Sequence, residues 1–116
     1  MSVENIHANE LRNLIKNHKD EIDIVDIREP SETNIIKIKG SKLIPMNELQ
    51  KRLDEIDWNK KVIFLCRSGS RSGMITNMLS NIGKDVSNLQ YGIAECYFKG
   101  KGENLVIDKE NIDRYF

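Results

Sequence analysis

The residues best suited to chemistry lie where a short apolar run ends in a cysteine. Residues 62–65 read Val-Ile-Phe-Leu, which predicts a buried strand, and Cys66 follows directly. Residues 67–73 are polar or glycine, and apolar residues at helical spacing begin at Met74. In open α/β sheets, ligands bind at the carboxyl ends of the strands. Cys66 therefore stands where such a sheet would place its site.

This loop can stabilise a negative charge on the cysteine sulfur. A tight loop that leads into a helix directs backbone N–H groups inward and adds the positive end of the helix dipole. Arg67 and Arg71 add positive charge, while Gly69 and Gly73 let the backbone bend. We expect the pKa of Cys66 to fall below the value of about 8.5 of a free thiol, which makes it a nucleophile at neutral pH. Taken alone, the pattern also fits a buried structural cysteine followed by an ordinary turn.

The surrounding pattern predicts an α/β domain with a mainly parallel sheet. Residues 22–27 read Ile-Asp-Ile-Val-Asp-Ile, and the apolar residues among them suit a strand whose two faces are both covered by helices. Apolar runs alternate with helical spacings along the chain, as they do in parallel sheets joined by helices. We expect strands at 22–27, 42–45, 62–65 and 86–89, an edge strand at 105–107, and helices at 8–18, 47–56, 74–82 and 93–98.

Length and charge narrow the class of protein. The chain has 116 residues, so we expect one domain over 1–116, with its core at about 6–100 and a C-terminal extension at 101–116 that could cover an edge or meet a partner. Eighteen basic and eighteen acidic residues give zero net charge, which argues against binding to nucleic acid or an anionic membrane. No apolar run approaches the roughly 20 residues of a membrane span. The N-terminus lacks the features of a signal peptide, so a cytoplasmic protein is expected.

The distribution of ligand residues predicts neither a metal nor an organic cofactor. Cys66 and Cys96 are the two cysteines of the chain, and their separation of 30 residues is neither a disulfide framework nor a metal-site spacing. His7 and His18 flank or lie on the first expected helix, where we expect them at the surface and not as ligands.

Three motifs together make the chain resemble the rhodanese family of sulfurtransferases. Residues 66–72, Cys-Arg-Ser-Gly-Ser-Arg-Ser, resemble the active-site loop of that family. Residues 26–32, Asp-Ile-Arg-Glu-Pro-Ser-Glu, resemble its Asp-Val-Arg-x-x-x-Glu segment, and residues 89–93, Leu-Gln-Tyr-Gly-Ile, resemble its Leu-x-Gly-Gly-Ile turn. The resemblance extends from about Ile6 to Gly100. It implies the rhodanese-like three-layer fold, in which helices flank a mainly parallel central sheet of about five strands.

The chain departs from the family pattern outside the active-site loop. Where the family usually reads Gly-His-Ile-Pro-Gly-Ala, residues 36–41 read Ile-Lys-Ile-Lys-Gly-Ser, and Tyr91 replaces the first glycine of the Gly-Gly turn. Cys96 stands where the family often has a tryptophan. We expect Cys96 to fill a hydrophobic slot in the core, although it could instead act as a resolving thiol for an oxidised Cys66. The scaffold and the rim of the site have therefore diverged, while the loop is intact.

The resemblance implies a chemical role for each loop residue. Cys66 would take a sulfane sulfur from an anionic donor, such as thiosulfate or a low-molecular-weight persulfide, and pass it from a cysteine persulfide to a thiol or cyanide acceptor. Arg67 could project outward to attract the donor or could be a solvated surface arginine. The residues that would bind the substrate and form the anion cradle are Arg67, Ser68, Gly69, Ser70, Arg71 and Ser72.

Asp26 and Arg28 are expected to support this loop without reacting. Arg71 could pair with a carboxylate to brace the loop, and Asp26, at the end of the neighbouring strand, is the natural candidate. Alternatively, backbone N–H groups would satisfy Asp26, and Arg28 would pair with Glu32.

Two other functions compete with a sulfurtransferase. Cysteine phosphatases and arsenate reductases on the same fold place five residues between the cysteine and the arginine, whereas four lie between Cys66 and Arg71. A loop one residue shorter makes a smaller cradle, which suits sulfur better than a tetrahedral phosphate. The other candidate is a persulfide carrier or binding module that serves a protein partner with little small-molecule turnover. The loop fits such a carrier equally well, because a carrier needs the same persulfide.

Overall fold

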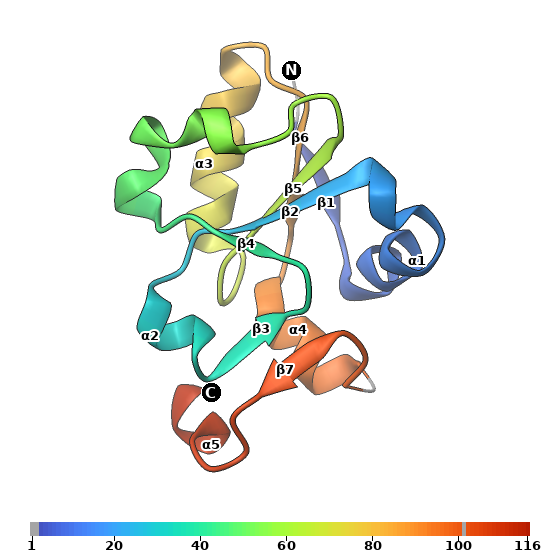
Figure 1. The fold of residues 1–116 in the computed structure, drawn as a ribbon, viewed down its shortest axis with the longest axis vertical. Helices are drawn as coiled ribbons and strands as arrows, with labels where there is room; N and C mark the ends of the chain where they lie inside the picture. Colours follow the sequence, from blue (N-terminus) through green and yellow to red (C-terminus); the bar gives the residue numbers. More distant parts are fainter. Residues whose placement is uncertain (1–2, 101) are drawn as a thin grey trace.

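The computed structural model describes residues 3–100 and 102–116, and a five-stranded parallel sheet runs through its centre (Figure 1). The strand order is β1-β6-β5-β2-β4, and every neighbouring pair is parallel. The expected fold class is therefore confirmed. The strands are β1 (Glu4–Ile6), β2 (Ile22–Asp26), β4 (Lys42–Leu43), β5 (Lys61–Leu65) and β6 (Val86–Leu89). The first of these was not predicted, because two of its three residues are polar and exposed.

Strand β5 lies in the middle of the sheet because its side chains are apolar on both faces. Val62 and Phe64 point to one face while Ile63 and Leu65 point to the other, and all four are fully buried. Alternate residues of a strand face opposite sides, so each face receives its own hydrophobic cluster. The strand expected at 62–65, followed directly by Cys66, is confirmed, and it begins one residue earlier, at Lys61.

Helices cover both faces of the sheet. Helix α1 (Ala8–His18) and helix α4 (Gly92–Lys99) pack on the face of Ile63, and helix α3 (Ser70–Asn81) packs on the face of Phe64. Figure 1 shows α1 and α3 on opposite sides of the central strands. The three helices predicted at 8–18, 74–82 and 93–98 are confirmed, although α3 begins four residues earlier than its apolar pattern does.

The helix expected at 47–56 is wrong in type. The segment forms two 3₁₀ helices, Met46–Lys51 and Leu53–Glu55, which pack beside α3. Their N–H groups bond to carbonyls three residues earlier, as Arg52 does with Leu49 at 3.0 Å. Apolar residues spaced three or four apart fit both kinds of helix, so the spacing could not distinguish them.

A second, two-stranded sheet joins the middle of the chain to its C-terminal segment. Strand β3 (Ile36–Ile38) pairs antiparallel with β7 (Leu105–Ile107). The strand expected at 105–107 is thus present, but it does not join the central sheet. In β3, the first and third residues are buried against the cluster under α1 and α4, while Lys37 is exposed. This alternation is typical of a strand with one buried face.

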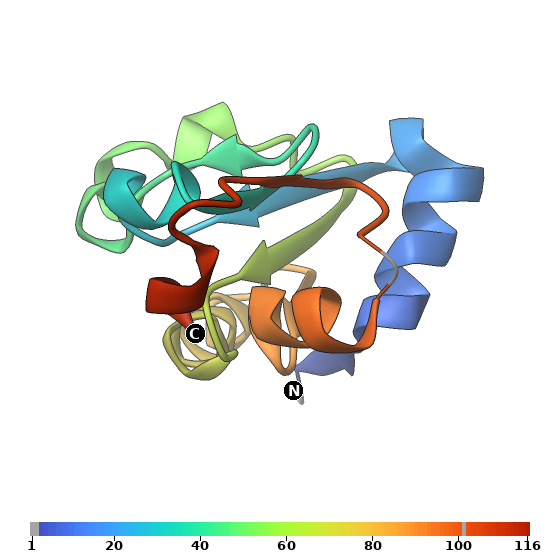
Figure 2. The same ribbon diagram turned by 90° about the horizontal axis from the view of Figure 1, so that it is seen from below.

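The C-terminal segment then returns to the main body of the protein. After β7, the short helix α5 (Ile112–Tyr115) follows, and Ile112 is buried in the same cluster as β3. A short helix α2 (Pro30–Thr33) lies between β2 and β3. Figure 2 shows α5 beside the loop that leads into α3, so the segment ends next to Cys66's loop.

None of the helices in residues 3–100 and 102–116 has both the length and the apolar character that crossing a membrane requires.

Candidate active site

Cys66 follows directly after β5, and hydrogen-bond donors of the active-site loop, residues 66–72, surround its sulfur. The backbone N–H of Gly69 lies 3.1 Å from the Sγ atom. The backbone N–H and the hydroxyl of Ser72 each lie 3.4 Å from it. Cys66 is only 1% exposed, so little water reaches the sulfur. The loop therefore provides the polar contacts that a sulfur anion would otherwise take from solvent.

These contacts lower the pKa of Cys66, as the sequence predicts. Burial by itself would raise the pKa of this thiol. Hydrogen bonds from the Ser72 hydroxyl and from the backbone N–H groups of Ser72, Gly69 and Ser68 outweigh burial and hold the pKa below its ordinary value. A larger fraction of Cys66 is consequently a thiolate at neutral pH than in an ordinary buried cysteine.

Two glycines fix the shape of the active-site loop. Gly69 has φ of +95°, and a Cβ there would lie 1.7 Å from the carbonyl oxygen of Gln90. Gly92 has φ of +64°, and a Cβ there would lie 2.4 Å from the carbonyl oxygen of Arg67. Both positions combine a left-handed backbone with contact against another segment, so only glycine fits. Tyr91 has φ of −107°, which any residue adopts, and this explains why the chain tolerates a tyrosine there.

The N-terminus of α4 binds the carbonyl groups of the first two residues of the loop. The N–H of Ile93 donates to the carbonyl of Cys66, and the N–H of Ala94 donates to the carbonyl of Arg67, both at 3.0 Å. The first N–H groups of a helix have no partner within the helix, so these two bonds satisfy the N–H groups of α4 as well as the carbonyl groups of the loop. With these carbonyls held by α4, the N–H groups farther along the loop are the ones that face Sγ.

The ion pairs around the loop differ from both expected arrangements. Arg71 does not contact Asp26; it pairs with Glu32 through two hydrogen bonds of 2.9 and 3.0 Å. Arg28 pairs with Asp26, at 2.8 Å between Nη2 and Oδ2. The alternative arrangement had Asp26 bound by backbone N–H groups and Arg28 paired with Glu32. Only its first part is present, as the backbone N–H of Arg28 donates to Asp26. The reason is local: residues 26 and 28 lie two apart at the end of a strand, so their side chains share one face.

Glu32 joins the site although the sequence marked it only as a partner for Arg28. Burial would raise the pKa of Glu32, but hydrogen bonds from Arg71, from the Glu29 backbone and from Tyr115 lower it to about 2. Glu32 is therefore a carboxylate at any pH near neutral and holds Arg71 in place. The sequence could have pointed to Glu32 as a site residue, because the motif Asp-Ile-Arg-Glu-Pro-Ser-Glu at residues 26–32 ends in this glutamate.

Tyr115 is a site residue that the sequence did not identify. Its hydroxyl accepts a hydrogen bond from Arg28 at 3.0 Å and donates one to Glu32 at 2.8 Å. Its backbone carbonyl accepts two hydrogen bonds from the Arg67 guanidinium, at 3.1 and 2.8 Å. Arg67 is thus exposed but anchored by the C-terminal segment. The position of Tyr115 depends on the pairing of β3 with β7, which no local pattern predicts.

The other serines of the loop lie at its outer side. The hydroxyls of Ser68 and Ser70 are 3.5 Å apart and both residues are exposed. Ser68 contributes to the sulfur environment through its backbone N–H, whereas no contact of the Ser70 side chain with Sγ is present in the described structure. The predicted loop residues therefore surround the sulfur mainly with backbone, and Ser72 is the one that adds a hydroxyl.

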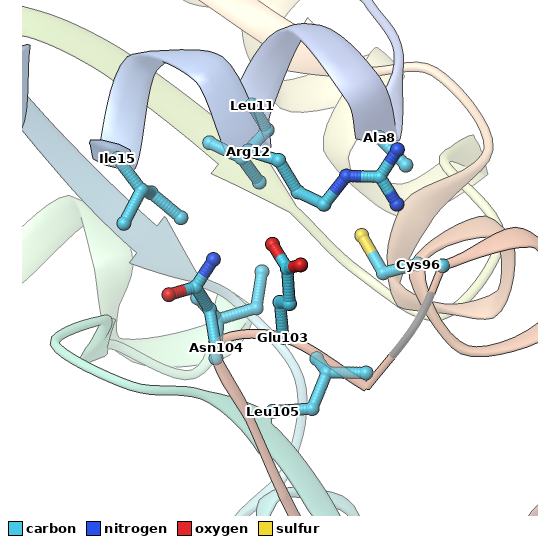
Figure 3. A pocket seen from close by; sticks show the side chains of 10 residues that line it. Ala8, Leu11, Arg12, Ile15, Cys96, Glu103, Asn104 and Leu105 are labelled. Atoms are coloured by element: carbon cyan, nitrogen blue, oxygen red, sulfur yellow. The ribbon is translucent and has the colours of Figure 1, made fainter. Parts of the chain in front are cut away.

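Cys96 lies away from Cys66, in the core on the other face of the sheet. Cys66 packs in the cluster under α3, and Cys96 packs against the cluster under α1 and α4. Cys96 lines a cavity of about 10 Å³. Figure 3 shows its side chain together with those of Arg12 and Glu103, which line the same cavity. Burial and the charge of Glu95 raise the pKa of Cys96 to about 11. This placement favours the expected core role over a resolving thiol.

The histidines and acidic residues do not form a metal centre in residues 3–100 and 102–116, where no group of three possible ligands comes together. The side chains of His7 and His18 are 42% and 50% exposed. His7 contacts Glu95 and the ring of Tyr91, and His18 contacts Glu21. Both histidines are at the surface, as expected.

Comparison with known proteins identifies the family. Residues 7–97 match the rhodanese-like domain, and the chain belongs to this family. Over 83 residues it is 34% identical to YrkF of Bacillus subtilis, a protein with a provisional assignment as a sulfur carrier; the match covers 71% of this chain and 44% of YrkF. It is 25% identical to the thiosulfate:glutathione sulfurtransferase of Saccharomyces cerevisiae, covering 90% of this chain and 84% of that enzyme. The chain spans about half the length of YrkF and of another B. subtilis relative, YqhL.

Solved structures show the same fold. A rhodanese-related protein from Thermoplasma volcanium superimposes with a TM-score of 0.78 at 28% identity, covering 90% of this chain and 99% of that one. A thiosulfate sulfurtransferase from Pseudomonas aeruginosa gives 0.77 at 28% identity, covering 90% of this chain and 20% of that one. The family and its named relatives support a role in sulfur transfer in general.

Replacing Ser72 with alanine should raise the pKa of Cys66 by about one unit, because a hydrogen bond to a charged group contributes roughly 1.5 kcal/mol or more. The hydroxyl also lies 2.6 Å from Asn88 Oδ1, but a charged sulfur is the stronger acceptor for its single proton. The rate of alkylation by iodoacetamide, measured against pH in a Cys96→Ala background, gives this pKa. Ser80→Ala, on the same helix, is the matched control. An unchanged midpoint in Ser72→Ala would show that the backbone alone stabilises the thiolate.

Replacing Arg28 with alanine should destabilise the fold by about 3 to 5 kcal/mol, because it leaves the carboxylate of Asp26 buried without its partner. Arg28 and Asp26 are at most 1% exposed, and Arg28 also donates to the carbonyl of Ile36 at 2.6 Å. Urea denaturation measures the change. Arg52→Ala, which removes a partly exposed arginine with two carboxylate partners, should cost far less. Similar losses in the two variants would contradict a structural role for the buried pair.

Proposed function

We propose that this protein is a sulfurtransferase that moves a sulfane sulfur from an anionic donor to a thiol acceptor through a persulfide on Cys66. The donor is thiosulfate or a low-molecular-weight persulfide. One observation carries the proposal. Cys66 directly follows a buried strand, and its sulfur faces three hydrogen-bond donors from Gly69 and Ser72. Membership of the rhodanese-like family and relatives named for sulfur transfer support it.

The first step forms the persulfide. The Cys66 thiolate attacks the outer sulfur of thiosulfate, and a new S–S bond forms. The bond between that sulfur and the sulfonate group breaks, and its electron pair leaves with sulfite. No oxidant or reductant is needed, since the sulfane sulfur is transferred between two nucleophiles. The lowered pKa of Cys66 supplies the thiolate for this attack.

The second step returns the enzyme to its starting state. The thiolate of an acceptor, or cyanide, attacks the outer sulfur of the persulfide. The S–S bond to Cys66 breaks and its electron pair returns to Sγ as a thiolate. The donors that surround Sγ before the reaction are in place for this leaving group, because the N–H groups of Gly69 and Ser72 belong to the fixed backbone.

The surroundings of the loop favour sulfur chemistry over phosphate chemistry. The Nη1 and Nη2 atoms of Arg71 both donate to the carboxylate of Glu32, so this guanidinium is not directed at a tetrahedral anion over the loop. A phosphatase needs such an arginine to hold phosphate through two parallel hydrogen bonds. The spacing of four residues between Cys66 and Arg71 agrees with this assignment.

Incubation with thiosulfate should add the mass of one sulfur atom to the protein, and cyanide or a thiol should remove it. Intact mass spectrometry measures both changes. The Cys66→Ala variant should gain nothing. Cys96→Ala is the matched control and should load sulfur as the unaltered protein does, because Cys96 lies on the other face of the sheet. If the folded, reduced protein loads no sulfur from thiosulfate or glutathione persulfide, the proposal is wrong.

Repeated turnover should follow loading when a small thiol acceptor is present. We expect sulfite to form in proportion to time and to exceed the protein concentration many times over, because the leaving group at Cys66 is a stabilised thiolate. Sulfite release measured with thiosulfate and glutathione tests this. A single equivalent of sulfite, with no further turnover, would instead identify a persulfide carrier that requires a protein acceptor.

A further inference from the structure

Two aromatic residues at the end of the C-terminal segment hold the first arginine of the active-site loop. The Arg67 guanidinium donates two hydrogen bonds to the carbonyl of Tyr115, at 3.1 and 2.8 Å. Its central carbon lies 5.3 Å from the centroid of the Tyr115 ring and 5.5 Å from that of Phe116. We call Tyr115 and Phe116 the aromatic clamp. The clamp lies outside residues 7–97, the part of the chain that matches the family.

The clamp holds Arg67 without neutralising its charge. Glu32 compensates Arg71, and Asp26 compensates Arg28. By contrast, no carboxylate among residues 3–100 and 102–116 lies within 4.0 Å of the Arg67 guanidinium nitrogens, and its contacts are a carbonyl and two rings. An aromatic face and a carbonyl attract a cation but carry no net charge. In the described residues, the charge of Arg67 therefore has no carboxylate in direct contact with it.

The clamp is itself anchored to the core of the site. The Tyr115 hydroxyl bridges Arg28, which is completely buried, and Glu32, which holds Arg71. The Phe116 ring stacks on Tyr97 of α4, with ring centroids 5.1 Å apart and an angle of 17°. Tyr115 thus touches one arginine of the loop directly and reaches the other through Glu32. The groups that hold Arg67 are thus themselves hydrogen-bonded or packed against other parts of the site.

We propose that the aromatic clamp determines substrate specificity: it fixes the direction of Arg67, the loop residue next to Cys66, so that the site selects negatively charged sulfur donors over neutral ones of similar size. Thiosulfate belongs to the favoured class, and a neutral organic trisulfide belongs to the disfavoured class. The inference rests on the proposed function for its sulfur donors, while selection of anions by the site can be measured without sulfur transfer. An arginine fixed in one direction loses less conformational entropy on binding an anion than a mobile one does.

Two alkylating reagents test the selection directly. Iodoacetate is an anion and iodoacetamide is neutral, and both react with the Cys66 thiolate, so the ratio of their rates is independent of the pKa of Cys66. In a Cys96→Ala background, Arg67→Ala should lower the ratio of the iodoacetate rate to the iodoacetamide rate about three- to fivefold, the range expected for one exposed charge. Tyr115→Leu and Phe116→Ala should lower the ratio in the same direction. Tyr97→Phe, which keeps the ring that stacks on Phe116, is the matched control and should leave it unchanged.

Sulfur-transfer kinetics on the same variants extend the test to donors. The KM for thiosulfate should rise about threefold with little change in kcat, because the clamp acts on donor binding and not on the reacting sulfur. The rate at which the Cys66 thiolate reacts with a neutral organic trisulfide, forming a mixed disulfide and releasing the alkyl persulfide anion, should not change. Phe116→Ala removes none of the polar contacts of Tyr115, so it remains informative if Tyr115→Leu fails to fold.

The outcomes separate this inference from the proposed function. If the unaltered protein loads sulfur but neither clamp variant changes the alkylation ratio, the clamp has no role in selection and the inference is overturned. It is also overturned if the rates of both reagents rise by the same factor in the clamp variants, because the clamp would then only limit access to Cys66. If the ratio falls but thiosulfate loads no sulfur in any protein, anion selection by the clamp is supported and the proposed function fails.

Discussion

The hydrogen bonds between the N-terminus of α4 and the carbonyls of Cys66 and Arg67 are the contacts on which the rest of the site depends. A loop of this length exposes as many carbonyl oxygens as N–H groups, and carbonyls directed at the sulfur would raise its pKa instead of lowering it. Helix α4 binds two of these carbonyls, and the N–H groups of Gly69 and Ser72 lie on the side of Sγ. The close approach this requires is possible because residue 92 has no Cβ.

Charge around the site is arranged in neutral pairs, with one exception. Asp26 with Arg28 and Glu32 with Arg71 are each balanced, and Tyr115 connects the two pairs through its hydroxyl. A buried pair such as Asp26 with Arg28 needs every polar atom satisfied, and no buried side-chain nitrogen or oxygen in the described part of the chain lacks a partner. Arg67 stands outside this arrangement, held by groups without net charge. Among the residues that the structure describes, the site therefore combines two balanced ion pairs with an arginine at its edge that no carboxylate contacts.

The sequence predicted the parts of the molecule that short-range patterns determine. The buried strand at 62–65, its end at Cys66 and the glycines of the loop follow from residue types and spacing, and the position of Cys66 in the sheet follows from the parallel topology. The partners of Arg28 and Arg71 could not be predicted, because each arginine had more than one carboxylate within reach of its motif. The role of Tyr115 was out of reach for a different reason: it depends on contact between residues more than 80 apart in the chain.

The two-stranded sheet of β3 and β7 lets the rim of the site open independently of the central sheet. This sheet shares no hydrogen-bonded strand with the central one, and it carries the segment that ends at Tyr115. Short elements at the periphery open more readily than a central sheet does, in cooperative units smaller than the whole protein. Separation of β7 from β3 would therefore release Arg67 while the N–H groups around Cys66 stay in place. Cys66 and the residues that hold Arg67 would then belong to two parts of the protein that unfold separately. Temperature or a binding partner could affect one part without the other.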